Sequence, residues 1–213
     1  GKAALQAQAD VLAAAEERFG VDRHVVVAIW GVESNFGRTL GRRPLVQSLS
    51  TLSCFGRRQA FFRGELLATL RIVERDEIPV TDLAGSWAGA FGQTQFIPST
   101  FQRLAVDFDG DGRRDIVNSV ADALGSTANH LAAAGWRRSE PWGYEVRLPP
   151  GFSAERLGRT NRRPLTEWTA AGVRRVDGGA LSGPAQGAIL APSGTGGPAW
   201  LVFRNFDAIY AYN

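Results

Sequence analysis

The sequence predicts a mainly α fold of the α+β kind, in which a helical domain carries a small strand-and-loop subdomain before a C-terminal helix. Between residues 3 and 134, apolar residues recur three or four positions apart, bounded by helix-start and helix-stop residues. After Gly135 the chain becomes rich in Pro and Gly, and its apolar residues form short alternating runs typical of strands. We therefore expect a helical domain over 1–140, a β/loop subdomain over 141–198, and a terminal segment over 199–213 that returns to the helical domain.

Composition sets limits on the kind of protein. A chain of 213 residues with 44% hydrophobic and 21% charged residues can bury a full core and is ordinary for a soluble globular protein. The net charge of +3 gives no strong signal for nucleic-acid binding. Cys54 is the single cysteine, so an intrachain disulfide is excluded. No apolar run is long enough to cross a membrane, and we expect no transmembrane segment in this chain.

The helices can be placed from their start and stop signals. An Ala-rich helix over residues 3–19 should end at Gly20, and a second should run from the N-cap Asp22 to Gly37. Apolar spacing predicts further helices, at residues 45–52, 60–74, 98–104, 120–134 and 206–210. Alternating or apolar runs predict strands, at residues 144–148, 187–191 and 200–203.

Glu33 is the strongest candidate for chemistry. Val26, Ile29, Trp30 and Val32 form the apolar face of the second helix, and Glu33 follows Ile29 by four positions and Trp30 by three. Desolvation there, together with the nearby helix C-terminus, is expected to raise the pKa of Glu33. Such a carboxyl keeps a proton ready for delivery near neutral pH. The alternative is a Glu that reaches solvent or pairs with an Arg.

A segment of small residues follows, from Ser86 to Gly92, where a ligand could approach the backbone closely. Neutral amides and aromatic rings lie in or beside it: Trp87, Phe91, Gln93, Gln95 and Phe96. Sugars are bound by this mixture, since amides meet the hydroxyl groups and flat rings meet the sugar faces. The alternative is a helix start that Gly and Ala pack tightly.

An acidic loop predicts a structural Ca²⁺ site. Oxygen-bearing side chains occupy positions 1, 3, 5 and 9 of an EF-hand-like loop with Gly at position 6: Asp107, Asp109, Asp111, Asp115 and Gly112. The backbone carbonyl of Arg113 would stand at position 7. Position 12 is Asn118 instead of Glu, and Asp122 could close a longer loop. The alternative is an Asx-rich turn that needs no metal.

Three of these segments resemble one family. Residues 31–37 look like the Glu-Ser motif of lytic murein transglycosylases, and residues 88–101 look like the second motif of the same enzymes. With the acidic loop at 107–112, the match narrows to the membrane-bound lytic transglycosylase B type of the lysozyme-like superfamily. The resemblance runs from about residue 10 to residue 213.

The resemblance implies an activity. The enzyme would cleave the β-1,4 bond between N-acetylmuramic acid and N-acetylglucosamine in peptidoglycan and leave 1,6-anhydromuramic acid ends. Glu33 would be the single acid and base, with no catalytic cofactor, because the residues offer one strong carboxylate candidate and no clear second one. Asp76, Glu77 and Asp82 are expected to be solvated. Two alternatives remain: a lysozyme-type muramidase, which is a hydrolase, and a non-catalytic peptidoglycan-binding scaffold.

The resemblance also implies site residues. Ser86, Gln95, Tyr212 and Asn213 would orient the sugar, and Arg58 would lie near the peptide or muramyl groups; Phe96 joins this set as an aromatic surface. The family's atypical, longer calcium loop implies a ligand set of Asp107, Asp109, Asp111, Arg113 and Asp122. The expected partners are peptidoglycan glycan strands and proteins of cell-wall synthesis or turnover. The expected location is the periplasm, with an outer-membrane anchor on a removed N-terminal segment.

Overall fold

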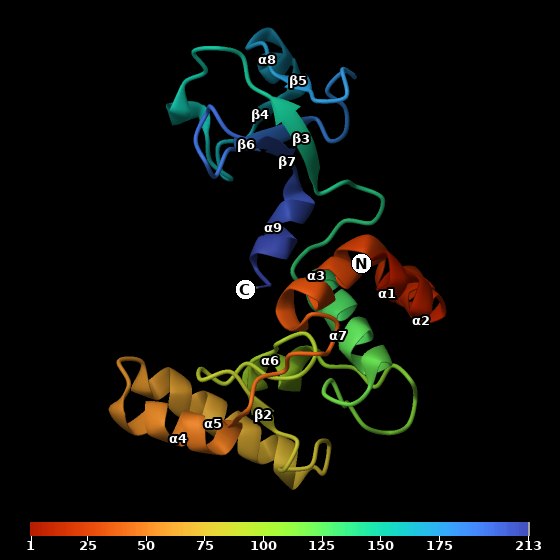
Figure 1. Cartoon of the computed structure of the whole chain (residues 1–213), viewed down its shortest axis with the longest axis vertical. Helices are drawn as coiled ribbons and strands as arrows, with labels where there is room; N and C mark the ends of the chain where they lie inside the picture. Colours follow the sequence, from red (N-terminus) through yellow and green to blue (C-terminus); the bar gives the residue numbers. More distant parts are fainter. Residues whose placement is uncertain (213) are drawn as a thin grey trace. The chain divides into compact units, whose positions relative to one another are not determined.

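The computed structural model describes residues 1–212 and divides after Ala133 into two compact units. The first unit is helical, and the second is built on a small antiparallel sheet (Figure 1). The predicted fold class, mainly α with a strand-and-loop subdomain before the last helix, is therefore confirmed.

Two helices form the N-terminal segment where the sequence predicts one. Helix α1 spans Lys2–Ala7 and helix α2 spans Ala9–Phe19, with a break at Gln8. Gly20 ends α2 as expected. It adopts the left-handed conformation, with φ of 73°, and its N–H donates to the carbonyl of Glu16.

The next three helices include a helical hairpin. Helix α3 spans Arg23–Ser34. Helix α4, Leu45–Phe55, and helix α5, Gln59–Glu74, pack side by side (Figure 1). The turn between them carries the exposed side chains of Arg57 and Arg58.

The buried face of α5 differs from the predicted one. Leu67 and Leu70 belong to the apolar spacing that predicts this helix, yet both of these side chains are exposed. The buried residues instead lie on the face toward α4 and α6: Phe62, Glu65, Ala68, Thr69 and Ile72. Apolar spacing found the helix, but its rotation follows from the packing partners on either side.

Helix α7 lies at the centre of the first unit. It spans Val120–Ala133, contacts α2, α3 and α6, and buries most of its residues. Helix α6 spans Pro98–Leu104, and Pro98 is its first residue. A short antiparallel pair, β1 at Arg43–Pro44 and β2 at Ala84–Gly85, joins the two loops that lead toward the site.

The second unit has a five-stranded antiparallel sheet in the order β4-β6-β7-β3-β5. Its strands are β3 at Gly143–Arg147, β4 at Arg163–Pro164, β5 at Arg174–Arg175, β6 at Gln186–Leu190 and β7 at Ala199–Val202. A 3₁₀ turn at Ala154–Arg156, helix α8 at Leu165–Ala170 and helix α9 at Arg204–Tyr210 complete it.

Trp168 anchors the core of the second unit. Its side chain is fully buried, and its indole N–H donates to the carbonyl of Gly187 at 2.8 Å. Around it pack Val146, Phe152, Val173, Ile189 and Leu201. A ring buried in this way anchors the subdomain and has no exposed surface that could line a binding groove.

The C-terminal segment is tied to the sheet of the second unit. Strand β7 pairs with both β3 and β6, and α9 follows it directly. The return of residues 199–213 to the helical domain stays a prediction.

Candidate active site

Glu33 occupies the penultimate position of α3. The helix starts where expected, because the side chain of Asp22 accepts a hydrogen bond from the His24 N–H at 2.7 Å. It ends at Ser34, since Asn35 turns into the left-handed conformation with φ of 50°. The helix therefore stops before the predicted Gly37, and Glu33 lies in its last turn.

The helical face around Glu33 is only partly apolar. Val26, Ile29 and Trp30 are buried as predicted, but Val32 is 82% exposed and does not belong to this face. Glu33 itself is half-buried and lies next to the buried Ser34. The raised pKa expected for Glu33 stays a prediction.

Ser34 fixes the end of the helix. Its hydroxyl accepts from the Gly37 N–H at 2.8 Å and lies 3.3 Å from the Trp30 carbonyl oxygen, to which it donates. Its carbonyl accepts from the Thr39 N–H at 2.9 Å. The residue beside Glu33 thus bonds the chain on both sides, which holds the backbone under the carboxylate in place. These hydrogen bonds explain in structural terms why a serine directly follows Glu33.

Aromatic packing supports the same turn. The Phe36 ring lies against Gly31, where an added Cβ would come within 2.7 Å of the ring, so residue 31 has no room for a side chain. Phe36 also meets Trp30 edge to face, with ring centroids 5.4 Å apart. Because Gly31 and Trp30 precede Glu33 by two and three positions, this cluster stiffens the last turn of α3.

Gln93 connects α3 to the small-residue loop. Its side-chain carbonyl accepts from the Trp30 indole N–H at 3.0 Å, and its amide group donates to the Val117 carbonyl at 3.1 Å. The side chain is almost fully buried. The sequence suggested that Gln93 meets sugar; the structure shows instead that it braces the site from within.

Ser86 organises the loop that follows β2. Its hydroxyl accepts from the N–H groups of Ala88 at 3.3 Å and Ala90 at 3.0 Å. Gly85 must be Gly, since a Cβ would lie 2.0 Å from the Ala90 carbonyl oxygen. Both of these hydrogen bonds use the hydroxyl oxygen of Ser86 as acceptor, and so its O–H group can still donate to a ligand.

Gln95 has a fixed amide. Its backbone φ is +54°, which is unusual for a residue with a side chain. Its amide NH₂ donates to the carbonyls of Gly92 at 2.9 Å and Leu40 at 3.3 Å. The side chain therefore offers its carbonyl oxygen, an acceptor, to any ligand at the loop.

The three aromatic residues of this loop differ in exposure. Trp87 is 67% exposed and can lie against a sugar ring. Phe91 is fully buried and packs on Phe101 at 5.6 Å, and Phe96 is 2% exposed and meets the His130 ring at 5.4 Å. A sugar contact of Phe91 or Phe96 would need a buried ring to be uncovered.

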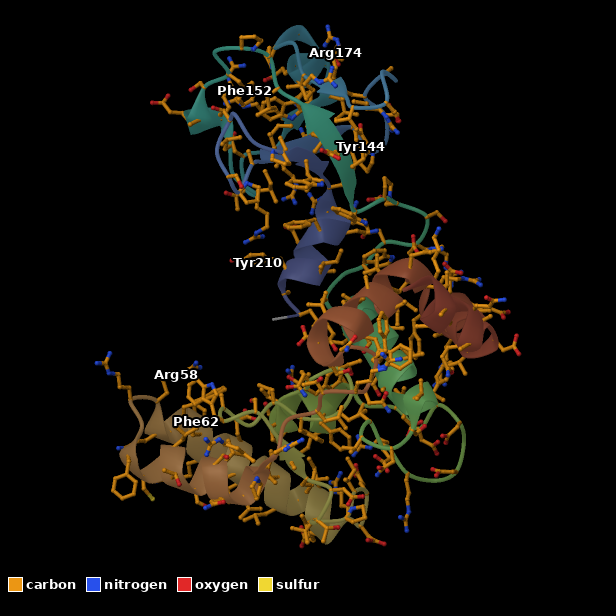
Figure 2. All side chains as sticks on the ribbon, viewed as in Figure 1. Arg58, Phe62, Tyr144, Phe152, Arg174 and Tyr210 are labelled. Carbon is orange, nitrogen blue, oxygen red and sulfur yellow. The ribbon has the colours of Figure 1, made fainter. Side chains whose placement is uncertain are left out.

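Arg58 is exposed at the tip of the α4–α5 hairpin, and its guanidinium lies 4.0 Å from the centre of the Phe61 ring (Figure 2). In the second unit, the Tyr212 N–H donates to the Ile209 carbonyl at 3.2 Å. Asn213 lies outside the described residues. The binding roles of Arg58, Tyr212 and Asn213 stay predictions.

Other acidic residues of the first unit are tied to protein partners. Glu65, 4% exposed, accepts from the backbone N–H and the hydroxyl of Ser99 at 2.8 and 2.7 Å, which caps α6. Spacing gave no sign of this buried acid. Glu77 is also largely buried and pairs with Arg114, so its expected solvation is wrong, while Asp76 is exposed as expected.

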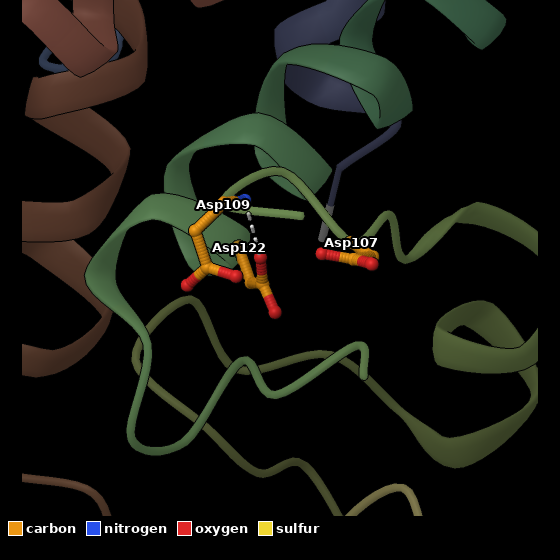
Figure 3. A group of neighbouring side chains, drawn as sticks. All are labelled: Asp107, Asp109 and Asp122. Atoms are coloured by element: carbon orange, nitrogen blue, oxygen red, sulfur yellow. Dashed lines mark hydrogen bonds between the residues drawn. The ribbon is translucent and has the colours of Figure 1, made fainter. Parts of the chain in front are cut away.

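The acidic loop brings three carboxylates together. Ligand oxygens of Asp107, Asp109 and Asp122 all lie within 4.8 Å of one another, beside the start of α7 (Figure 3). Asp122 is fully buried and accepts from the N–H groups of Phe108 and Asp115, each at 2.7 Å. Burial raises the pKa of Asp122, and the bonds from the backbone N–H groups act against this shift.

The donor chemistry of this cluster fits Ca²⁺. Carboxylate oxygens are the ligands that Ca²⁺ prefers, and three like charges at this distance repel one another without a cation. Asn118, the residue at loop position 12, directs its amide NH₂ to Asp82 and Asp115 and does not join the group. Asp111 also lies outside the three-carboxylate group.

None of the helices within residues 1–212 has the length and apolar character needed to span a membrane.

The transglycosylase SLT domain family matches the chain over residues 1–213. The chain is also 34% identical over 217 residues to membrane-bound lytic murein transglycosylase B of Escherichia coli, which covers 96% of this chain and 56% of that protein.

Two solved structures are similar along the whole chain. SltB3 from Pseudomonas aeruginosa, in complex with NAG-anhNAM-pentapeptide, is 50% identical with a TM-score of 0.94, and the match covers 100% of this chain and 58% of that one. Escherichia coli Slt35 in complex with calcium is 31% identical with a TM-score of 0.86, and the match covers 99% of this chain and 67% of that one. This chain thus spans little more than half the length of the curated relative and of SltB3. It belongs to the transglycosylase SLT domain family and shares the lysozyme-like fold of these lytic transglycosylases.

Proposed function

We propose that this chain is the catalytic part of a lytic transglycosylase that cuts peptidoglycan between N-acetylmuramic acid and N-acetylglucosamine and leaves 1,6-anhydromuramic acid ends. The observation that carries the proposal is Glu33, held by Ser34 at the end of α3 in a chain 50% identical to SltB3, whose structure contains NAG-anhNAM-pentapeptide.

In the first step, Glu33 delivers a proton to the glycosidic oxygen. The bond from that oxygen to C1 of the muramyl sugar breaks, and N-acetylglucosamine leaves with a new hydroxyl group. C1 then carries oxocarbenium-like charge, which the N-acetyl carbonyl of the same sugar relieves. Buried acids of the first unit such as Glu65 and Asp122 are bonded elsewhere, and so the substrate supplies its own stabilising group.

In the second step, the Glu33 carboxylate takes the proton from the C6 hydroxyl of the muramyl sugar. The C6 oxygen attacks C1 and closes the 1,6-anhydro ring, and Glu33 ends protonated as it began. No water is consumed. Because nucleophile and electrophile belong to one sugar, correct orientation replaces a strongly activated nucleophile.

The small-residue loop supplies that orientation. Ser86 can donate through its O–H group and Gln95 can accept through its carbonyl oxygen, which together match the C=O and N–H of an acetamido group. Trp87 offers an exposed ring to a sugar face. Tyr212 and Asn213 are proposed to complete sugar binding, and Arg58 to lie near the peptide or muramyl groups.

The acidic cluster is proposed to hold a structural Ca²⁺. Asp107, Asp109 and Asp122 would bind the ion, and Asp111 and the Arg113 carbonyl would add ligands. The ion would neutralise the cluster and fasten the loop to α7. The calcium complex of Slt35 supports this choice of metal.

The test is digestion of purified sacculi by wild type, Glu33→Gln and the matched control Glu74→Gln, an exposed Glu on α5. We expect Glu33→Gln to lose solubilisation and Glu74→Gln to keep it. Solubilisation by Glu33→Gln at the wild-type rate would contradict the role of Glu33. If both wild type and Glu33→Gln bound sacculi and neither solubilised them, the chain would be a binding scaffold.

We further propose a periplasmic location with an outer-membrane anchor, and partners among proteins of cell-wall synthesis or turnover. The name of the membrane-bound relative supports the location. Fractionation of the cells that make this protein tests it, and recovery in the cytoplasmic fraction would contradict it. In-cell cross-linking tests the partners, and recovery of proteins unrelated to the wall would contradict that proposal.

A further inference from the structure

The second unit is strongly basic. Residues 134–213 carry ten Arg and six Asp or Glu residues, for a formal net charge of +4, whereas residues 1–133 carry a net charge of −1. The excess of positive charge therefore lies in the second unit, which does not contain the proposed catalytic residue Glu33.

Three of these Arg residues surround one cavity. It has a volume of about 220 Å³ and is lined within the second unit by Arg137, Glu140, Arg162, Gln186 and Arg204. These residues come from the segment before β3, the residue before β4, the start of β6 and the start of α9. Residues distant in sequence thus converge on a space large enough for a small polar group.

The walls of the cavity are held in place by Asn205. This fully buried side chain accepts from the Arg137 N–H at 2.7 Å and donates to the carbonyls of Arg137 and Glu140 at 2.9 and 2.7 Å. One amide thereby joins the 137–140 segment to α9. The geometry of the cavity is set before any ligand arrives, which lowers the entropy cost of binding.

The cationic groups of the cavity are incompletely paired. Arg204 forms no ion pair with any residue that the structure describes. Arg137 meets only Glu140 among the described acids, at 3.5 Å, and Arg162 shares Asp207 with Arg159. The lining of the cavity thus holds three guanidinium groups and one carboxylate, that of Glu140, and keeps a positive excess.

Within residues 1–212, two side-chain atoms of the lining residues have no hydrogen-bond partner although they are shielded from solvent. They are Nε of Arg162 and one carboxylate oxygen of Glu140. Buried polar atoms are normally paired, because an unpaired one loses its hydration without compensation. A donor and an acceptor left over in the same wall fit a ligand that carries both an anionic oxygen and an N–H group.

We infer that this cavity binds the carboxyl terminus of a peptide, and, resting on the proposed function, that the peptide is the stem of peptidoglycan. A C-terminal residue presents a carboxylate together with its own amide N–H. Arg204 and Arg162 would meet the carboxylate, since guanidinium groups bind carboxylates with paired hydrogen bonds. Glu140 would accept from the N–H group.

The experiment measures binding of the free muramyl pentapeptide to the 213-residue chain by calorimetry, next to the same peptide with its C-terminal carboxylate converted to an amide. We expect the amide to bind about tenfold more weakly, the effect of losing one charged hydrogen bond. Equal affinity for the two peptides would overturn the inference.

Variants locate the site. Arg204→Gln should lower the affinity for the peptide with the free carboxylate about tenfold and leave the affinity for the peptide amide unchanged. The control Arg156→Gln removes the same charge from an exposed position of the second unit outside the cavity. It should change the affinity for neither peptide. An effect of Arg58→Gln in place of Arg204→Gln would assign the carboxylate to the hairpin tip and overturn the inference.

Two further arms separate the possible failures. Inorganic phosphate should not compete with the peptide at equal concentration; competition would show a general anion site and refute the peptide assignment. If wild type digests sacculi normally but the chain binds the peptide acid and the peptide amide with equal affinity, this inference is refuted and the proposed function stays intact. Carboxylate-dependent binding without digestion would refute the proposed function and support the cavity.

Discussion

The Trp30 indole N–H donates to the side-chain carbonyl of Gln93 at 3.0 Å, which connects the helix that carries Glu33 to the loop that carries Ser86 and Gln95. The amide group of Gln93 reaches onward to the Val117 carbonyl. One buried side chain therefore sets how the proposed acid and the proposed sugar-binding residues lie in the first unit.

Replacing Gln93 tests this brace. Gln93→Leu would leave the Trp30 N–H and the Val117 carbonyl unpaired, and we expect the free energy of unfolding to fall by about 1–3 kcal/mol. Urea denaturation measures it, with Gln6→Leu on the exposed face of α1 as the control. A Gln93→Leu protein as stable as the control would show that the brace contributes nothing.

Ser34 should act on the rate through Glu33. Ser34→Ala removes the acceptor for the Gly37 N–H, at a cost of about 1 kcal/mol in stability. Because a shift near 1 Å at a catalytic group can cost about a hundredfold, we expect kcat to fall by about ten- to a hundredfold while KM changes little. Steady-state kinetics on a soluble glycan fragment measures both.

The control for Ser34 is Ser48→Ala on α4, whose hydroxyl forms no hydrogen bond within the described residues. It should keep both kinetic constants. If Ser34→Ala kept wild-type kcat, the helix end would not position Glu33.

Helix starts and stops could be predicted from the sequence because they are local. Asp22 caps α3 through the N–H of His24, two residues away, and Gly20 ends α2 with a bond to Glu16. The site was less predictable because its supports are distant in sequence. Nothing near Gln93 indicates that it pairs with Trp30, and nothing near Glu65 indicates Ser99.

Apolar spacing also failed to tell which side of a helix faces the core. It placed Val32 with the buried residues of α3, although this side chain is largely exposed, and it missed the burial of Phe91 and Phe96 as core rings. In each case the partner that decides burial comes from another element of the fold.

Calcium should stabilise the folded chain. An ion at 100 times its dissociation constant would add about 2.7 kcal/mol, which raises Tm by several degrees. We expect Asp122→Asn to abolish this increase, because the buried carboxylate joins the loop to α7, whereas Asp10→Asn on α2 keeps it. Thermal melts with calcium and with chelator measure it. Identical melting of wild type in both would contradict the calcium site.

His130 should make stability depend on pH. Burial, and then the positive charge of Arg103, lower the pKa of His130 below its ordinary value of 6.5. Between the lowered pKa and 6.5 the unfolded chain binds more protons than the folded one, so this contribution to stability is complete above pH 6.5 and declines as the pH falls below it.

Removal of the imidazole tests this assignment. The difference in stability between pH 7.5 and pH 5.5 should shrink in His130→Gln and persist in His24→Gln, an exposed His on α3. Chemical denaturation at both pH values measures it. The same pH dependence in wild type and His130→Gln would assign it to other groups.

The central claim is that the C6 hydroxyl of the muramyl sugar, and not water, attacks C1 after Glu33 protonates the leaving group. Digestion of sacculi by the wild-type chain in water labelled with oxygen-18, followed by mass spectrometry of the released muropeptides, tests it most directly. The account predicts products one water lighter than hydrolysis products, with no label at C1. Products that carry a labelled oxygen at C1 would identify a hydrolase and contradict it.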